Sequence, residues 1–313
     1  MQRKKNIRLI GILMTLLIIL VVLSFVDQKK DQLDISRDSF SLANTNEINR
    51  VEFSSASGKN RLDFQRNDWT INQKYKADLQ RITVLFSVLK QVKVRKKVAK
   101  LEQPLIDSLF QNQGVKVSFY SGEVLEKEFL AVGYRENNLT YFNNGDETYI
   151  VQIPGYNVYI ADIFGLDENG WRDPLVVNMD WINLSSVEMV YPERLEDSFK
   201  VDFVNRNFII DGIDQPDSTR VGNFLDDVST LYVNDYLFAE ELSQYDSLLS
   251  EKQATVLVTD VGKNSYSIEF FQGIDRKEIL VRIDSSEYGL VDYNKARKIL
   301  RPKSFFRPER GGQ

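Results

Sequence analysis

The chain opens with an unbroken apolar run and continues with short segments in which apolar and polar positions alternate. The run Leu9–Val26 reads LIGILMTLLIILVVLSFV, eighteen residues without a charge. About 20 apolar residues of α-helix cross a hydrocarbon core of ~30 Å, and a buried helix of a globular protein is rarely apolar on every face. The pattern therefore predicts one transmembrane helix over Leu9–Val26.

The charges beside this helix predict its orientation. The four residues before it that carry charge are all basic: Arg3, Lys4, Lys5 and Arg8. No acidic residue precedes Asp27, so the positive-inside rule keeps residues 1–8 in the cytoplasm and places the body in the periplasm or outside the cell. A cleaved signal peptide stays open as an alternative, with a weak cleavage site at Val22-Leu23-Ser24.

A pattern of alternating apolar residues begins after a charged stretch and occurs twice. Leu62 and Phe64, then Trp69 and Ile71, alternate around a polar turn, which predicts a β-hairpin. The matching positions of the second occurrence are Val201, Phe203, Phe208 and Ile210, each 139 residues later. We interpret the correspondence as an internal repeat.

An amphipathic helix follows each hairpin. Apolar residues at helical spacing occur at Ile82, Leu85, Phe86, Leu89 and Val92. The same spacing recurs 139 residues later at Val221, Phe224, Leu225, Val228 and Leu231. Asp217 or Ser218 is a suitable N-cap for the second helix.

Further strands complete each half, and together the elements predict an α+β fold. The expected architecture is two tandem copies of a β-β-β-α-β-β-β unit with largely antiparallel sheets, preceded by the transmembrane helix. The predicted boundaries are a cytoplasmic basic N-terminus at 1–8, the membrane helix at 9–26, a juxtamembrane stalk at 27–47, a first repeat at 48–170, a second repeat at 171–300 and a basic, disordered tail at 301–313.

Composition removes several classes of chemistry. Only four of the 40 basic residues precede the helix, whereas all 45 acidic residues follow it, so the exported body is acidic and unsuited to general nucleic-acid binding. The chain has no cysteine and no histidine. Disulfides, a lipoprotein anchor, thiol chemistry, conventional zinc sites and a Ser-His-Asp triad are therefore excluded. We expect no cofactor and no metal.

The segment between the two repeats holds the candidate binding residues. It reads Gly170-Trp171-Arg172-Asp173-Pro174. Trp171 and Arg172 have the chemistry to stack on a ligand, with Asp173 beside them. The alternative is structural: Trp171 fills the seam between the repeats, and Arg172 pairs with Asp173 or caps a helix.

Charged runs occur elsewhere in the body. The acidic pairs lack the spacing of an EF-hand. One basic run comprises Lys90, Lys93, Arg95, Lys96, Lys97 and Lys100, and another lies between Lys295 and Arg310. Such runs attract anionic lipid headgroups or an acidic partner, although a charge run is more often a solvated face.

Three features resemble the DUF4340 family, which has no known function. They are Asp68-Trp69 with the helix that follows, the strand region around Gly133, Thr140-Tyr141 and Tyr149-Ile150-Val151, and the junction Trp171-Arg172-Asp173-Pro174-Leu175. The resemblance spans most of residues 48–300. Members of that family are typically membrane-anchored and are often encoded beside ABC-transporter components of the gliding-motility type. The resemblance implies an accessory role at the cell envelope and supplies no catalytic or ligand-binding residue.

We therefore expect a non-enzymatic accessory protein whose exported body binds a membrane complex of the ABC-transporter type. A module that binds a small molecule or envelope polymer in the cleft between repeats, near Trp171, is the first alternative. A hydrolase that uses carboxylates is the second, because Asp, Glu, Lys, Ser and Tyr are the reactive side chains available.

Overall fold

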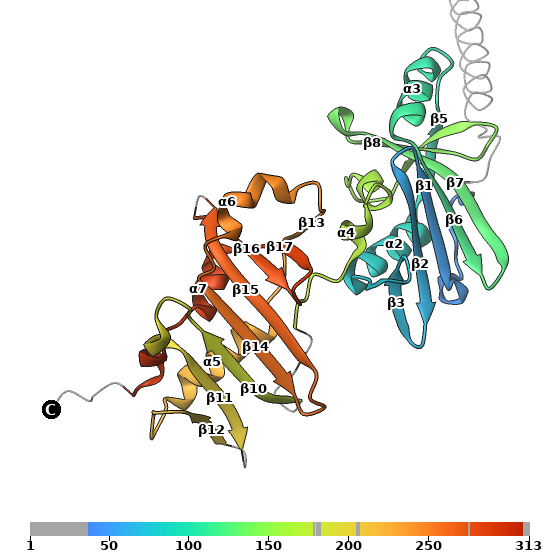
Figure 1. Cartoon of the computed structure of the whole chain (residues 1–313). Coiled ribbons are helices and arrows are strands. Elements are labelled where there is room, and N and C mark those ends of the chain that lie inside the picture. Colours follow the sequence, from blue (N-terminus) through green and yellow to red (C-terminus); the bar gives the residue numbers. More distant parts are fainter. Residues whose placement is uncertain (1–36, 178, 180–182, 205–206, 275, 309–313) are drawn as a thin grey trace, which may run out of the picture. The chain divides into compact units, whose positions relative to one another are not determined.

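The computed structural model describes residues 37–308 except 178, 180–182, 205–206 and 275 (Figure 1). The predicted membrane helix Leu9–Val26 lies outside these residues, and so do residues 27–36 of the predicted stalk. Within the described ranges, no helix combines the length and the apolar character needed to cross a bilayer. The anchor therefore stays a prediction from the sequence.

The described chain is an α+β protein with two antiparallel sheets, one of nine and one of eight strands. Contacts divide it into two compact units. The first unit comprises the described parts of Met1–Gln65 and Gln80–Gly165, and the second comprises those of Arg66–Leu79 and Leu166–Gln313. The division differs from a boundary at residue 170 because the segment Arg66–Leu79 belongs with the second unit.

The nine-stranded sheet has the order β4-β3-β2-β1-β6-β7-β8-β9-β5. Its strands are β1 (Arg50–Ser55), β2 (Gly58–Gln65), β3 (Asp68–Ile71), β4 (Tyr75–Lys76), β5 (Lys93–Lys97), β6 (Val115–Ser121), β7 (Val124–Tyr134), β8 (Leu139–Asn143) and β9 (Thr148–Gln152). The helical elements along this part of the chain are η1 (Thr45–Glu47), α2 (Leu79–Gln91), α3 (Gln103–Gln113), η2 (Arg135–Asn137) and η3 (Ile160–Phe164).

Local sequence explains the first hairpin and helix. Arg66 and Asn67 have φ of 51° and 72°, the backbone that a two-residue turn of type I′ requires. Helix α2 buries Ile82, Leu85 and Leu89, as the helical spacing predicts, together with Val88, whereas Phe86 is half-buried. Val92 is buried just beyond the helix end.

The eight-stranded sheet has the order β12-β11-β10-β14-β15-β16-β17-β13. Its strands are β10 (Leu184–Val190), β11 (Phe199–Val204), β12 (Asn207–Ile210), β13 (Asp235–Leu237), β14 (Ala254–Asp260), β15 (Ser265–Ile274), β16 (Glu278–Ile283) and β17 (Glu287–Asp292). The helical elements here are α4 (Glu168–Trp171), η4 (Leu195–Asp197), α5 (Ser218–Ser229), η5 (Leu242–Tyr245), α6 (Asp246–Leu249), α7 (Tyr293–Ile299) and η6 (Lys303–Phe306). Asp217 is the N-cap of α5, as predicted, and its carboxylate accepts the amides of Thr219 and Arg220.

The core of the second unit lies on the face of its sheet that α5 covers. Strand residues such as Val187 and Val201 pack there with Phe224 and Leu225 of α5. Because successive strand residues point to opposite faces, Phe271 points away from this core. It packs instead in a smaller cluster with Leu280 and Leu290, beside α6.

The first unit has the same two-sided packing. Phe40, Phe129, Phe142 and Phe164 form an aromatic cluster, with Phe129 stacked on Phe142 at 4.3 Å. A second cluster includes Ile106 of α3 together with Val132, Tyr141 and Ile150 of the sheet. Each sheet therefore buries apolar residues on both faces at one end.

The element list inferred from the sequence needs correction. It gives six strands and one main helix to each copy, whereas the sheets have nine and eight strands. Among the elements that it lacks are β5 and α3 in the first half, and β13 and α6 in the second. The basic run expected on and after the first helix supplies β5 itself. These elements escape the alternation pattern because edge strands bury few side chains, and Val94 is the one buried residue of β5.

Two segments expected to lie outside the body are packed onto it. Residues 37–47 were assigned to the stalk, yet Phe40 is buried against Phe129 and the Leu42 amide donates to the Leu89 carbonyl. The described part of the tail also differs from a disordered end. Phe306 is fully buried, 4.8 Å from the Phe199 ring and 5.3 Å from the Phe224 ring.

Candidate functional site

The junction between the halves is held by a short helix. The Asp167 carboxylate caps α4 by accepting the Gly170 amide at 2.6 Å. The helix ends at Trp171, which is fully buried. A completely buried indole leaves no face on which a ligand stacks, so Trp171 contributes packing.

Backbone hydrogen bonds join this junction to the segment Tyr75–Asp78. The Asp78 amide donates to the Trp171 carbonyl at 2.9 Å, and the Asp173 amide donates to the Lys76 carbonyl at 2.8 Å. Ala77 and Arg172 form an antiparallel bridge between these bonds. The junction therefore pairs like a short strand, and all of these residues belong to the second unit.

The side chain of Arg172 lies between two aromatic rings. Its guanidinium carbon is 3.9 Å from the centroid of Tyr75 and 3.6 Å from that of Tyr236. It also forms an ion pair with Glu287, and only 12% of the side chain is exposed. Cation–π contacts strengthen when they are shielded from water, so the protein's own groups occupy the faces and the edge of this guanidinium.

Asp173 contacts the protein as well. Its carboxylate accepts the Leu175 amide at 3.0 Å, and its carbonyl accepts the Tyr236 hydroxyl at 3.2 Å. The structure thus brings Trp171, Arg172 and Asp173 together, but the acidic partner of Arg172 is Glu287 and not Asp173. Nothing in the spacing of the sequence pointed to Tyr75, Tyr236 or Glu287, which lie far along the chain.

The buried tyrosine beside the junction, Tyr236, makes the stability of the folded protein decrease at alkaline pH. Burial raises the pKa of Tyr236 to about 12, against about 10 for an ordinary tyrosine. The folded protein keeps this proton where the unfolded chain has lost it, so the stabilisation is complete below pH ~10 and disappears as pH rises toward ~12. We expect urea unfolding to show Tyr236→Phe less stable by about 1 kcal/mol at neutral pH, for its lost hydrogen bond, with the gap narrowing above pH ~10. Parallel stability curves for the two proteins would contradict this.

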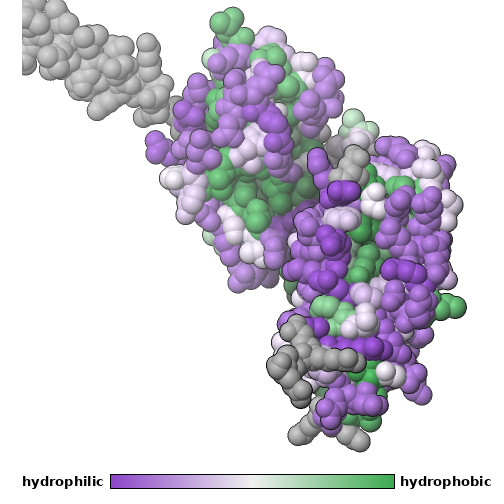
Figure 2. All heavy atoms as spheres, turned by 90° about the vertical axis from the view of Figure 1, so that its left-hand side faces the viewer, coloured by the Kyte–Doolittle hydropathy of each residue, from purple (hydrophilic) through white to green (hydrophobic). Residues whose placement is uncertain are grey.

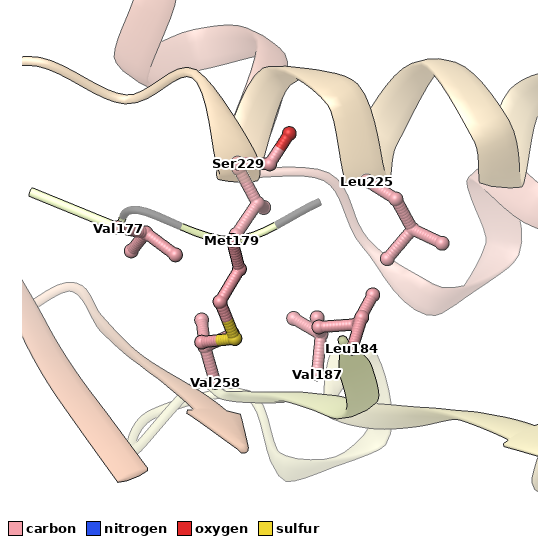
Figure 3. Close-up of a pocket in the computed structure, with 8 residues that line it drawn as sticks. Val177, Met179, Leu184, Val187, Leu225, Ser229 and Val258 are labelled. Carbon is pink, nitrogen blue, oxygen red and sulfur yellow. The ribbon is translucent and has the colours of Figure 1, made fainter. Parts of the chain in front are cut away.

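A small apolar cavity lies between α5 and the sheet of the second unit (Figure 3). Val187 and Val258 line it from the strands and Leu225 and Ser229 from α5, and Met179 points into it from a loop. Its volume is about 10 Å³, at the lower limit for one water molecule. Such a space has the size of a packing defect and not of a substrate site.

Three carboxyl groups among the described residues have a lowered pKa. Neighbouring hydrogen bonds lower the pKa of Glu128, Glu147 and Asp260. The donor with the largest effect is Lys116 for Glu128, Lys97 for Glu147 and Asn264 for Asp260. A glycosidase-type general acid needs a raised pKa. Among the described residues no three acidic side chains are grouped to hold a metal ion.

The junction is therefore a candidate site by its residue types and a packed connection by its contacts. No protein-family model and no curated protein matches the chain. The resemblance to the DUF4340 family stays a prediction from the motifs that carry it.

Proposed function

We propose that the two halves are tandem copies of one unit. When the strands are aligned in chain order, β1-β2-β3 correspond to β10-β11-β12, and β5 to β9 correspond to β13 to β17. On that alignment the two sheets have the same strand order, apart from the additional β4 at the edge of the first. The agreement in order of eight strands between the halves supports duplication more strongly than the sequence offsets do.

Two matching pairs of backbone hydrogen bonds support copies longer than the sequence pattern indicated. The Val94 amide donates to the Arg37 carbonyl, and the Val233 amide donates to the Pro174 carbonyl in the same position of the second copy. At the other end, Asp78 donates to Trp171, and Asp217 donates to Phe306. Each copy on this view begins with a segment before its first strand and ends with a buried aromatic residue.

We propose further that the protein is a non-enzymatic accessory protein, anchored in a membrane by Leu9–Val26, whose exported body binds a membrane complex of the ABC-transporter type. The engagement of Arg172 by Tyr75, Tyr236 and Glu287 carries this proposal. These contacts shield Arg172 from solvent, and Trp171 is buried beside it. The two best candidates for ligand binding therefore contribute to packing. The surface in Figure 2 is mainly hydrophilic with local hydrophobic areas on each unit, which suits binding to another protein.

The ligand-binding alternative has weaker support because the cavity holds about one water and Trp171 is buried. The hydrolase alternative has weaker support because hydrogen bonds lower the pKa of Glu128, Glu147 and Asp260, whereas a general acid needs a raised pKa. Neither has an observation that favours it.

Affinity purification from native membranes in mild detergent tests the proposal. We expect the tagged full chain to recover membrane proteins that the tagged segment 1–36 alone does not, because the body and not the anchor makes the contact. Recovery of the same proteins with both baits, or of none with the full chain, would count against an accessory role. Catalytic turnover of an envelope substrate by the purified chain would favour the hydrolase instead.

A further inference from the structure

The free edge of the nine-stranded sheet is strongly basic. Strand β5 is at the end of the sheet and pairs with β9, Lys93 opposite Gln152 and Lys97 opposite Tyr149. We call the following residues on and beside it the basic edge: Lys90, Lys93, Arg95, Lys96, Lys97 and Lys100. Only Val94 of the strand is buried, so the charges determine what the edge presents to solvent.

Most of this charge is not neutralised within the described residues. Lys93 pairs with Asp38 and Lys97 pairs with Glu147. The other four residues of the basic edge are exposed and form no ion pair with a described carboxylate: Lys90, Arg95, Lys96 and Lys100. The edge therefore carries a net positive charge although the chain as a whole is acidic.

Two exposed leucines lie next to the basic edge. Leu101 follows Lys100 directly and is 93% exposed, and Leu105 in the first turn of α3 is 53% exposed. Figure 1 places α3 and β5 at the same end of the first unit. Exposed leucines beside lysine and arginine are typical of surfaces that rest in a membrane interface, where the charges meet headgroups and the apolar side chains enter the acyl boundary.

The chain enters the first unit at this strand. The Val94 amide donates to the Arg37 carbonyl at 2.9 Å, and Asp38 pairs with Lys93. Ten residues separate Arg37 from Val26, the end of the predicted membrane helix. Even fully extended they span no more than about 35 Å, so the basic edge is held close to the bilayer surface.

The second sheet provides an internal comparison. Its corresponding edge strand, β13, is Asp235-Tyr236-Leu237 and has no basic residue. Charge of either sign protects an edge strand from pairing with another chain, so protection alone does not explain the run of one sign on β5. The β13 edge also contacts the junction, since Asn169 donates to the Tyr236 carbonyl.

We propose that the basic edge, with Leu101 and Leu105, binds the anionic phospholipid headgroups of the membrane that anchors the chain. The inference rests on the anchor in the proposed function and adds a second, electrostatic contact with the same bilayer. Lysine and arginine near an anionic surface each contribute about fivefold to binding. The contact would fix the first unit against the membrane and so determine which of its surfaces a partner meets.

The test uses the full chain in lipid nanodiscs. Because the chain has no cysteine, Gln91→Cys gives a single site for an environment-sensitive fluorophore beside the basic edge, and Val261→Cys gives a matched reporter on an exposed turn of the second unit. We expect spin-labelled lipid to quench the reporter at position 91 several-fold more in discs with phosphatidylglycerol than in discs of phosphatidylcholine alone. The reporter at 261 should not distinguish the discs.

Salt and charge variants give the sharper outcome. About 1 M salt shortens the Debye length to about 3 Å and should remove the difference between discs. Replacement of Lys90, Arg95, Lys96 and Lys100 by glutamine should do the same, whereas replacement of Lys263, Lys277, Arg297 and Lys298 by glutamine should not.

Equal quenching in both discs would overturn the proposal, as would a signal that arises only after membrane proteins are added, which would indicate an acidic protein partner. A chain that fails to enter the discs would overturn the anchor itself, whereas one that enters without a lipid signal would overturn only the contact at the basic edge.

Discussion

Replacement of Trp171 by alanine is expected to destabilise the second unit by about 3–5 kcal/mol, the usual cost of removing a buried tryptophan. The indole is fully buried at the end of α4, and the backbone carbonyl of Trp171 accepts a hydrogen bond from the Asp78 amide. Losing the side chain should therefore also loosen the pairing of the junction with Tyr75–Asp78. Chemical denaturation measures the first effect, and hydrogen exchange at the Asp78 and Asp173 amides measures the second.

Two variants serve as controls for this result. Trp171→Phe keeps most of the apolar volume and should retain slow exchange at both amides, with a smaller loss of stability. Tyr156→Ala removes an aromatic side chain that is 67% exposed, and should change stability by no more than about 0.5 kcal/mol. If Trp171→Ala were as stable as the unaltered chain, the junction would not be the structural connection described above.

Replacement of Phe306 by alanine is expected to cost the second unit a similar amount, about 3–5 kcal/mol. Phe306 is fully buried between the rings of Phe199 and Phe224. Its carbonyl accepts the Asp217 amide at the start of α5, so the loss should reach that helix. Denaturation together with hydrogen exchange along α5 measures both effects.

A change one residue further along separates packing from chain position. Arg307→Ala alters an exposed side chain and should leave stability within about 0.5 kcal/mol of the unaltered protein. Deletion of residues 309–313 is expected to have no effect on the exchange of α5. A Phe306→Ala variant with unchanged stability would restore the view of residues 301–308 as a loose tail.

The sequence predicted the parts of the fold that depend on periodic burial. The helical spacing from Ile82 to Leu89 follows directly from which side chains face the core, and the two hairpins and two main helices agree with the structure. In the first hairpin Leu62, Trp69 and Ile71 are buried as the alternation indicates, whereas Phe64 is 41% exposed. The antiparallel arrangement follows from the short connections between strands.

Elements that bury little were not visible in the sequence. Strand β5 has one buried residue among four basic ones, and helix α6 has four residues and none that is buried. Their position is determined by backbone pairing and by contacts with distant parts of the chain, which leave no periodic trace. The tail differs for another reason. A basic segment with prolines at 302 and 308 favours a loose end, although Phe305-Phe306 between these prolines is the sign of a packed segment.

The contacts of the candidate residues could not be predicted from the sequence, and their role in binding stays a prediction. Trp171, Arg172 and Asp173 do lie together in an unusual arrangement. The groups around Arg172 come from β4, β13 and β17, and the periodicity of the sequence does not indicate which tyrosine or glutamate will contact it. Ligand binding and internal packing use the same side chains, so only geometry separates them.

The hydrogen bonds that end each half have a consequence for synthesis. The Asp78 amide cannot donate to the Trp171 carbonyl until Trp171 has been synthesised, and the Asp217 amide depends on Phe306 in the same way. The acceptor lies about ninety residues further along in each case. Strand β1 also needs β6, which follows a hairpin, two helices and β5. Contacts of such long range form slowly, and domains generally fold in order as the chain emerges. During synthesis the hairpin of each half therefore lacks these contacts until its closing aromatic residue has emerged, and a pause in synthesis within either interval would leave an apolar edge accessible to chaperones and proteases.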